Sequence, residues 1–222
     1  MPQSPRHRVY AWEFPVRLTH WINAVCIVAF SITGLYIGNP YMHAISSQQY
    51  IMGWMRFIHF VAAYVFLVMV ILRIYWMFVG NRYASWRVFI PLTKQQRKDF
   101  VGGLKFYLFI TKKAPYAVGH SAVASITYLV VFLLFIFEIV SGFALYSQTH
   151  LKSIIFSLLG GWLLGVMNVQ TIRLWHHVVM YFLIGFTIIH VYIGWYLDSI
   201  EKNGVMGSIF GGYKFVTGKE WE

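Results

Sequence analysis

Five histidines lie within or at the ends of long apolar runs, where ionisable residues are uncommon and usually functional. They are His20, His59, His176, His177 and His190. The neutral imidazole is a common ligand of transition metals, and two imidazoles on opposite sides of a haem iron suit it to electron transfer. The other histidines fall in polar stretches or at run edges, where we expect ordinary solvated side chains: His7, His43, His120 and His150.

The elements that carry these histidines are long apolar segments. Of the 222 residues 59% are hydrophobic and 11% charged, whereas soluble globular chains have roughly 45–50% and 25%. Crossing a bilayer takes about 20 apolar residues, and the backbone must then satisfy its own hydrogen bonds as a helix. We therefore predict an all-α integral membrane four-helix bundle, one domain over residues 1–222, with spans at about 18–37, 57–79, 122–146 and 175–197.

A fifth apolar stretch covers residues 153–172. It begins apolar but then contains Gly160, Gly161 and Gly165, and it ends with Asn168 and Gln170. These residue types favour an additional interfacial helix, or a re-entrant piece, before the fourth span. A full crossing is the alternative, although it would break the charge pattern of the loops.

Basic residues alternate between the loops. They are abundant before the first span and in residues 81–120, whereas residues 39–55 contain none and residues 147–172 contain only Lys152. Cytoplasmic loops carry the excess of Lys and Arg, so both termini and the long basic loop are predicted to be cytoplasmic. The net charge of +11 is thus a topology signal, and nucleic-acid binding is not expected.

This topology sorts the histidines by depth. His59, His176 and His177 fall near the outer face, whereas His20 and His190 fall toward the cytoplasm. On a helix, positions fourteen apart differ by about 40° and are about 21 Å apart, whereas positions thirteen apart differ by about 140°. His176 therefore shares a face with His190, and His177 points away.

Two stacked haems of the b type fit this arrangement. His59 and His176 would ligate the iron of an outer haem, with His177 as a backup for His176, and His20 and His190 that of an inner haem. A single buried histidine is more often hydrogen-bonded between helices, but four at two matching depths favour ligation.

Four arginines accompany these ligands. Arg17, Arg56 and Arg173 each stand three residues before a proposed ligand, one helical turn nearer to water. A guanidinium binds carboxylates such as haem propionates with paired hydrogen bonds, although an arginine that only snorkels to the interface is an open alternative. Arg73 stands fourteen residues after His59, and we expect it to contact the inner haem or a ligand beside it.

Other span residues have open roles. Glu138 is the one acid deep in a predicted span, and both a helix-packing hydrogen bond and a proton relay are possible for it. Glycines such as Gly34, Gly142 and Gly185 would let a porphyrin approach a helix backbone, but they are equally ordinary in membrane helix packing.

Several stretches resemble the b-type cytochrome subunit of membrane-bound nickel–iron hydrogenases. They are Arg17-Leu-Thr-His20-Trp21 with Thr33-Gly34, Arg56-Phe-Ile-His59, Gly80-Asn81-Arg82-Tyr83, and Arg173-Leu-Trp-His176-His177 with Phe186-x-x-x-His190. The resemblance covers essentially the whole chain. It implies that the first histidine of the adjacent pair is the constant one, in agreement with the helical-face argument. Leu174 stands where that family usually has a small residue.

The resemblance also implies a role and partners. Such subunits lie in the bacterial inner membrane, anchor the iron–sulfur (small) and nickel–iron (large) hydrogenase subunits, and pass electrons through their haems to quinone. The chain would then be an electron-transfer subunit of an oxidoreductase and not a catalyst by itself. Three alternatives remain: a related subunit of a formate dehydrogenase or thiosulfate reductase complex, a stand-alone diheme quinone oxidoreductase, and a haem-free anchor or transporter.

Overall fold

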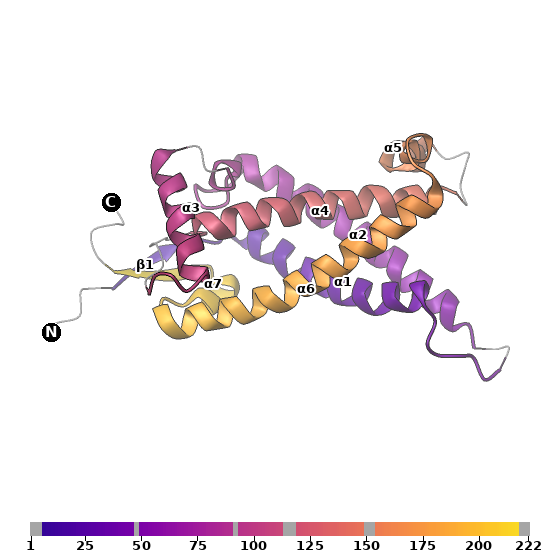
Figure 1. The fold of residues 1–222 in the computed structure, drawn as a ribbon, viewed down its shortest axis with the longest axis horizontal. Helices are drawn as coiled ribbons and strands as arrows, with labels where there is room; N and C mark the ends of the chain where they lie inside the picture. The colour runs from indigo at the N-terminus through magenta and orange to yellow at the C-terminus, as the bar shows by residue number, and fades with distance from the viewer. Residues whose placement is uncertain (1–5, 47–48, 91–92, 113–118, 149–153, 218–222) are drawn as a thin grey trace. The chain divides into compact units, whose positions relative to one another are not determined.

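The computed structural model describes residues 6–46, 49–90, 93–112, 119–148 and 154–217, so His150 lies outside the described residues. Most of these residues are helical, and two short strands lie at the two ends of the described chain (Figure 1). The elements in order are β1 (Arg6–Tyr10), α1 (Phe14–Gly38), α2 (Ile51–Val79), η1 (Trp86–Val88), α3 (Lys94–Tyr107), α4 (Ala122–Ser147), α5 (Ile154–Leu159), η2 (Gly161–Gly165), α6 (Val169–Glu201), α7 (Val205–Gly211) and β2 (Tyr213–Thr217).

Four of these helices are long and apolar enough to cross a membrane. α1, α2, α4 and α6 have 25, 29, 26 and 33 residues, against the about 20 that a bilayer core requires. Only 11–22% of their most apolar stretches is buried inside the protein, so most of that apolar surface needs lipid around it. The predicted all-α membrane bundle is confirmed, and each predicted span lies inside one of these helices.

The chain divides into two compact units, and each long helix contributes to both. Unit 1 comprises residues 1–20, 71–130 and 189–222, and unit 2 comprises residues 21–70 and 131–188. The division matters for the site because it separates the candidate ligands. His20 and His190 belong to unit 1, whereas His59, His176 and His177 belong to unit 2.

Unit 1 contains a small sheet that the sequence analysis missed. β1 pairs antiparallel with β2, with Arg8 opposite Phe215. Beside the sheet, buried Trp12 donates its indole N–H to Ser208 of α7 at 3.0 Å. Glu13 accepts hydrogen bonds from the Trp76 indole and the Asn81 backbone N–H, both at 2.8 Å. These contacts fasten the segment before α1 to the end of α2.

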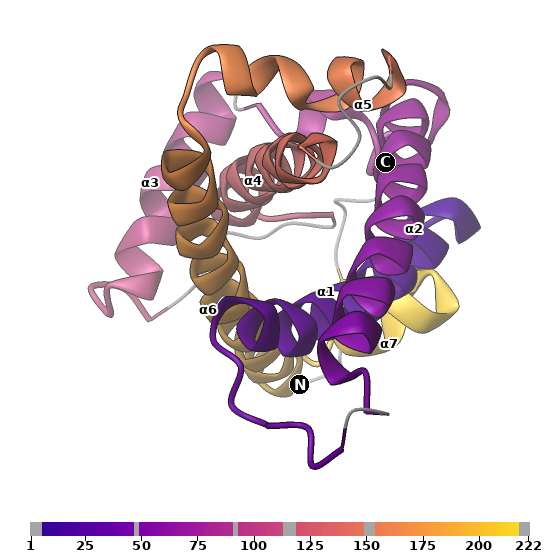
Figure 2. The same cartoon turned by 90° about the vertical axis from the view of Figure 1, so that its right-hand side faces the viewer.

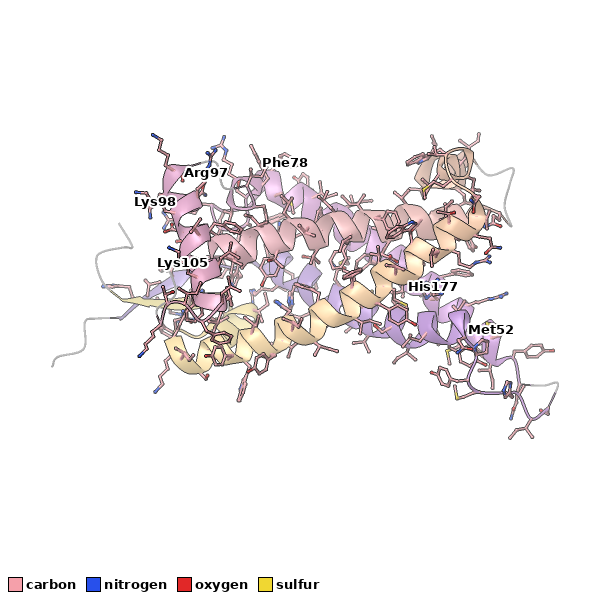
Figure 3. All side chains as sticks on the ribbon, viewed as in Figure 1. Met52, Phe78, Arg97, Lys98, Lys105 and His177 are labelled. Carbon is pink, nitrogen blue, oxygen red and sulfur yellow. The ribbon has the colours of Figure 1, made fainter. Side chains whose placement is uncertain are left out.

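A second unpredicted element of unit 1 is α3, within the long basic loop. Its N-terminus is a capping box, in which the Thr93 hydroxyl accepts from the Gln96 backbone N–H while the Gln96 side chain accepts from the Thr93 N–H. Arg97, Lys98 and Lys105 project outward from this helix (Figure 3). Four of the basic residues of this loop, Lys94, Arg97, Lys98 and Lys105, therefore lie on a helix.

In unit 2, α4 and α6 pack through buried Val131, Val179 and Leu183. Within the fifth apolar stretch, residues 154–168 form the six-residue α5 and the short η2, which lie at the end of α4 (Figures 1 and 2), and α6 begins at Val169. A methyl group at Gly160 would meet the Val140 carbonyl oxygen at 2.2 Å, so this segment contacts the α4 backbone directly. As expected, the segment is not a span-length helix.

Candidate haem sites

His59 of α2 is held in one tautomer by a hydroxyl group of α1. The Thr33 hydroxyl donates to the Ala29 carbonyl at 2.6 Å, one helical turn back, and lies 2.9 Å from His59 Nδ1. Because its own proton is used on the carbonyl, the hydroxyl accepts from Nδ1–H. His59 Nε2 is then the unprotonated nitrogen, which is the form that binds a metal.

His176 of α6 is held in the same way by α4. The Ser141 hydroxyl donates to the Phe137 carbonyl at 2.7 Å and lies 2.8 Å from His176 Nδ1. Glu138 Oε2 lies 3.0 Å from the same nitrogen. Two acceptors thus share the Nδ1–H, and Nε2 is again the nitrogen available to a metal.

His177 makes different contacts, although it follows His176 directly. Its Nδ1 donates to the Arg173 carbonyl of its own helix at 2.8 Å. A methyl group placed on Gly38 of α1 would lie 2.6 Å from His177 Nε2. That nitrogen therefore faces the α1 backbone, with no room for a porphyrin between them. Figure 3 labels His177 on α6, and the geometry favours His176 as the ligand.

The imidazoles of unit 2 lie near one another. His59 is close enough to interact electrostatically with both His176 and His177. On α4, a methyl group at Gly142 would lie 3.3 Å from the His176 ring, whereas nothing stands within 4 Å of such a group at Gly185. The His59–His176 pair thus combines two metal-competent imidazoles with the close α4 backbone at Gly142.

His20 and His190 form the pair of unit 1. Their ring centroids are 6.2 Å apart, with a 54° angle between the planes. Metal–imidazole bonds of about 2 Å put the centroids of two opposite ligands about 6 Å apart. The spacing of His20 and His190 thus fits two axial ligands of one iron, and His190 Nδ1 lies 3.3 Å from the Tyr128 hydroxyl.

The same unit contains two cations, the half-buried Arg73 and the buried Lys214. Arg73 donates weakly to the Ala84 carbonyl, at 3.3 and 3.4 Å, and its guanidinium lies 5.7 Å from the Phe89 ring. Lys214 is 6% exposed and donates to the Gly119 carbonyl at 3.4 Å. Within the described ranges neither forms an ion pair closer than 4.0 Å, so both cations are available to an anionic group such as a haem propionate.

Comparisons with known proteins decide the family. Residues 11–212 match the family described as prokaryotic cytochrome b561. The chain belongs to this family. The Cupriavidus necator protein named "Probable Ni/Fe-hydrogenase B-type cytochrome subunit" is 33% identical over 210 residues, covering 92% of this chain and 86% of its own. The Escherichia coli K12 protein named as the corresponding hydrogenase 1 subunit is 34% identical, covering 92% and 90%.

Membership of a b-type cytochrome family makes haem b the prosthetic group, and the residues described fit it. The two histidine pairs offer iron-binding nitrogens, and the cations of Arg73 and Lys214 belong to the same compact unit as the His20–His190 pair. Histidine nitrogen and propionate-binding cations are the chemistry that a b-type haem needs from its protein, since the porphyrin carries no covalent link.

The three arginines that precede the proposed ligands have local partners. Arg17 donates to the Phe210 carbonyl, and its Nε is buried with no hydrogen-bond partner among the described residues. Arg173 is exposed and donates to the Gln170 side chain at 3.0 Å, and Arg56 is exposed. A role in binding propionates remains a prediction for all three, with Arg17 the one enclosed by protein.

His120 of this cytochrome was wrongly expected to be solvated. Its ring lies against three aromatic rings, with centroids 4.6 Å from Trp12, 5.9 Å from Phe89 and 4.9 Å from Tyr128, and its Nδ1 is buried. By contrast, His43 is exposed as expected. The sequence does not reveal this enclosure because Trp12 and Phe89 come from segments far from His120 in the sequence.

The enclosure of His120 predicts a pH dependence of stability. Burial, followed by the charges of Arg73 and Lys214, lowers the pKa of His120 to about 3. The unfolded chain then binds a proton below pH 6.5 that the folded chain does not, so stability is lost as pH falls from 6.5 toward 3, at up to about 1.4 kcal/mol per pH unit. Thermal unfolding of the purified protein across this range measures the effect.

His120→Phe is the matched control for that experiment. Phenylalanine keeps an aromatic ring in the enclosure but cannot be protonated, so the unfolding temperature of this variant should fall less steeply with pH than that of the natural protein. Identical slopes for the two proteins would show that His120 does not titrate between the folded and unfolded states.

Proposed function

We propose that this chain is the membrane-anchoring electron-transfer subunit of a periplasmic nickel–iron hydrogenase. It would pass electrons from the iron–sulfur subunit through two haems to quinone. The proposal of two haems is supported by the separation of four histidines into two pairs, each within one compact unit. The hydrogenase partner is proposed from the names of the relatives.

Bound haem b supplies reversible one-electron transfer at its iron. The protein would supply the iron-binding nitrogens, from His59 and His176 in unit 2 and from His20 and His190 in unit 1. Thr33 and Ser141 would hold the ligands of unit 2 in the tautomer that leaves Nε2 for iron. Two histidine nitrogens for each iron would favour electron transfer over the binding of small ligands.

The direction of transfer follows from the topology that we propose. The distribution of basic residues supports a topology with both termini on the cytoplasmic side of the bacterial inner membrane. His59 and His176 would then lie toward the periplasm and receive electrons from the iron–sulfur subunit, whereas His20 and His190 would lie toward the cytoplasm, where quinone is reduced. The propionates of the haem at the His20–His190 site would be held by Arg73, Lys214 and Arg17.

Purification of the tagged chain from mildly solubilised membranes tests the partner. We expect the large and small hydrogenase subunits to co-purify, and hydrogen to reduce the haems of the complex. Recovery of formate dehydrogenase or thiosulfate reductase subunits instead would contradict the hydrogenase assignment. Full quinone turnover by the isolated subunit with a small reductant would indicate a stand-alone oxidoreductase.

A further inference from the structure

Glu138 lies in α4, inside a membrane-spanning segment, and contacts the candidate ligand His176. Its Oε2 is 3.0 Å from His176 Nδ1, and the two side chains are 16% and 17% exposed. Its Oε1 is buried and has no hydrogen-bond partner within the described residues. An acid in a membrane span is costly, so a contact of this kind points to a function for the carboxylate.

A carboxylate that accepts from the distal nitrogen of a histidine ligand makes the other nitrogen a stronger donor. A stronger donor stabilises the more positive ferric iron over the ferrous iron and thus lowers the reduction potential. Ser141 shares the same N–H at 2.8 Å, but a neutral hydroxyl polarises it less than a carboxylate does. Across the pair, the hydrogen-bond partner of His59 Nδ1 in the described part of the chain is the neutral Thr33 hydroxyl, at 2.9 Å. Glu138 therefore makes the ligand shell of this site asymmetric.

The His20–His190 pair has different surroundings. His190 Nδ1 lies 3.3 Å from the neutral Tyr128 hydroxyl. His120 lies close enough to interact electrostatically with both ligands and with the cations of Arg73 and Lys214. Lys214 in turn interacts electrostatically with the acids Glu201 and Asp198, so the charges in this unit are mixed in sign. What distinguishes the other site is the carboxylate held directly against His176.

We propose that Glu138, acting through His176, sets the reduction potential of the His59–His176 haem below that of the His20–His190 haem. Glu138 is a positioning and tuning residue, not a ligand. An electron that enters at the His59–His176 site would then move to the His20–His190 site with a favourable free energy. The inference rests on the two-haem arrangement proposed above, and it gives that arrangement a direction that does not depend on the partner.

Spectroscopic redox titration of the purified cytochrome tests the proposal. We expect two b-type components, of which the lower is missing from the His176→Ala protein. In Glu138→Gln the reduction potential of the lower component should rise by at least 59 mV, which for one electron is a tenfold change in the ratio of reduced to oxidised haem. The higher component should not move. A change of the higher component only, an equal change of both, or no change would overturn the proposal.

Ser141→Ala is the second variant, and it decides the matter even if Glu138→Gln loses a haem. Without the hydroxyl, His176 donates its N–H to the carboxylate alone, so the reduction potential of the lower component should stay unchanged or fall. A rise of this potential would show that the hydroxyl, not Glu138, sets it. A natural protein with fewer than two haems would instead refute the proposed two-haem function, so the two failures are distinguishable.

Discussion

Replacing His176 by Ala should leave the purified protein with one haem b where the natural protein has two. Its Nε2 is the nitrogen that Ser141 and Glu138 leave available to iron. Alanine offers no ligand, and its partner His59 alone cannot hold the iron in six-coordinate, low-spin form. His59→Ala should give the same loss. Haem content per chain and the low-spin signals of the ferric protein measure both effects.

His177→Ala is the matched control, since His177 is adjacent on the same helix. Its Nε2 faces the α1 backbone at Gly38, so its removal should leave both haems bound. Loss of a haem from His177→Ala, with both retained in His176→Ala, would reverse the assignment. Loss of both haems from His176→Ala, or of neither, would contradict the pairing of His59 with His176.

Replacing His190 or His20 by Ala should remove the other haem and stop quinone reduction. The two rings, 6.2 Å apart, share one site, so either substitution should have the same effect. The His59–His176 haem lies in the other unit and should remain reducible by the partner. Rates of haem reduction and of quinol formation, followed separately in the intact complex, measure the two steps.

His43→Ala serves as the control here, because His43 is an exposed loop residue. It should keep both haems and the natural rate of quinol formation. Quinol formation at the natural rate in His190→Ala would show that quinone does not receive its electrons through the His20–His190 site. Different haem losses in His190→Ala and His20→Ala would show that the two histidines do not ligate the same haem.

The membrane helices were predictable because their signal is local. Lipid surrounds each span, so apolar composition over about 20 residues indicates a helix without knowledge of its neighbours. The helical repeat likewise distinguished His176 from His177, and their contacts with α4 and with Gly38 agree with that distinction. The α3 helix also had a local signal that was overlooked, the Thr93-x-x-Gln96 capping box.

The features that were missed depend on residues distant in the sequence. Val9 of β1 pairs with Lys214 of β2, and neither strand has an alternation of polar and apolar residues strong enough to predict the sheet. The enclosure of His120 needs Trp12, which the sheet and α7 hold in place. The role of Glu138 was open because a sequence shows an acid in a span but not the histidine 3.0 Å away.

Haem quantification in the purified protein tests the central claim most directly. A pyridine haemochrome assay, read against the protein concentration from amino-acid analysis, gives the number of haems b per chain. The two-pair arrangement predicts two haems per chain, with reduced-minus-oxidised bands of the b type. One haem per chain, or none, would contradict it.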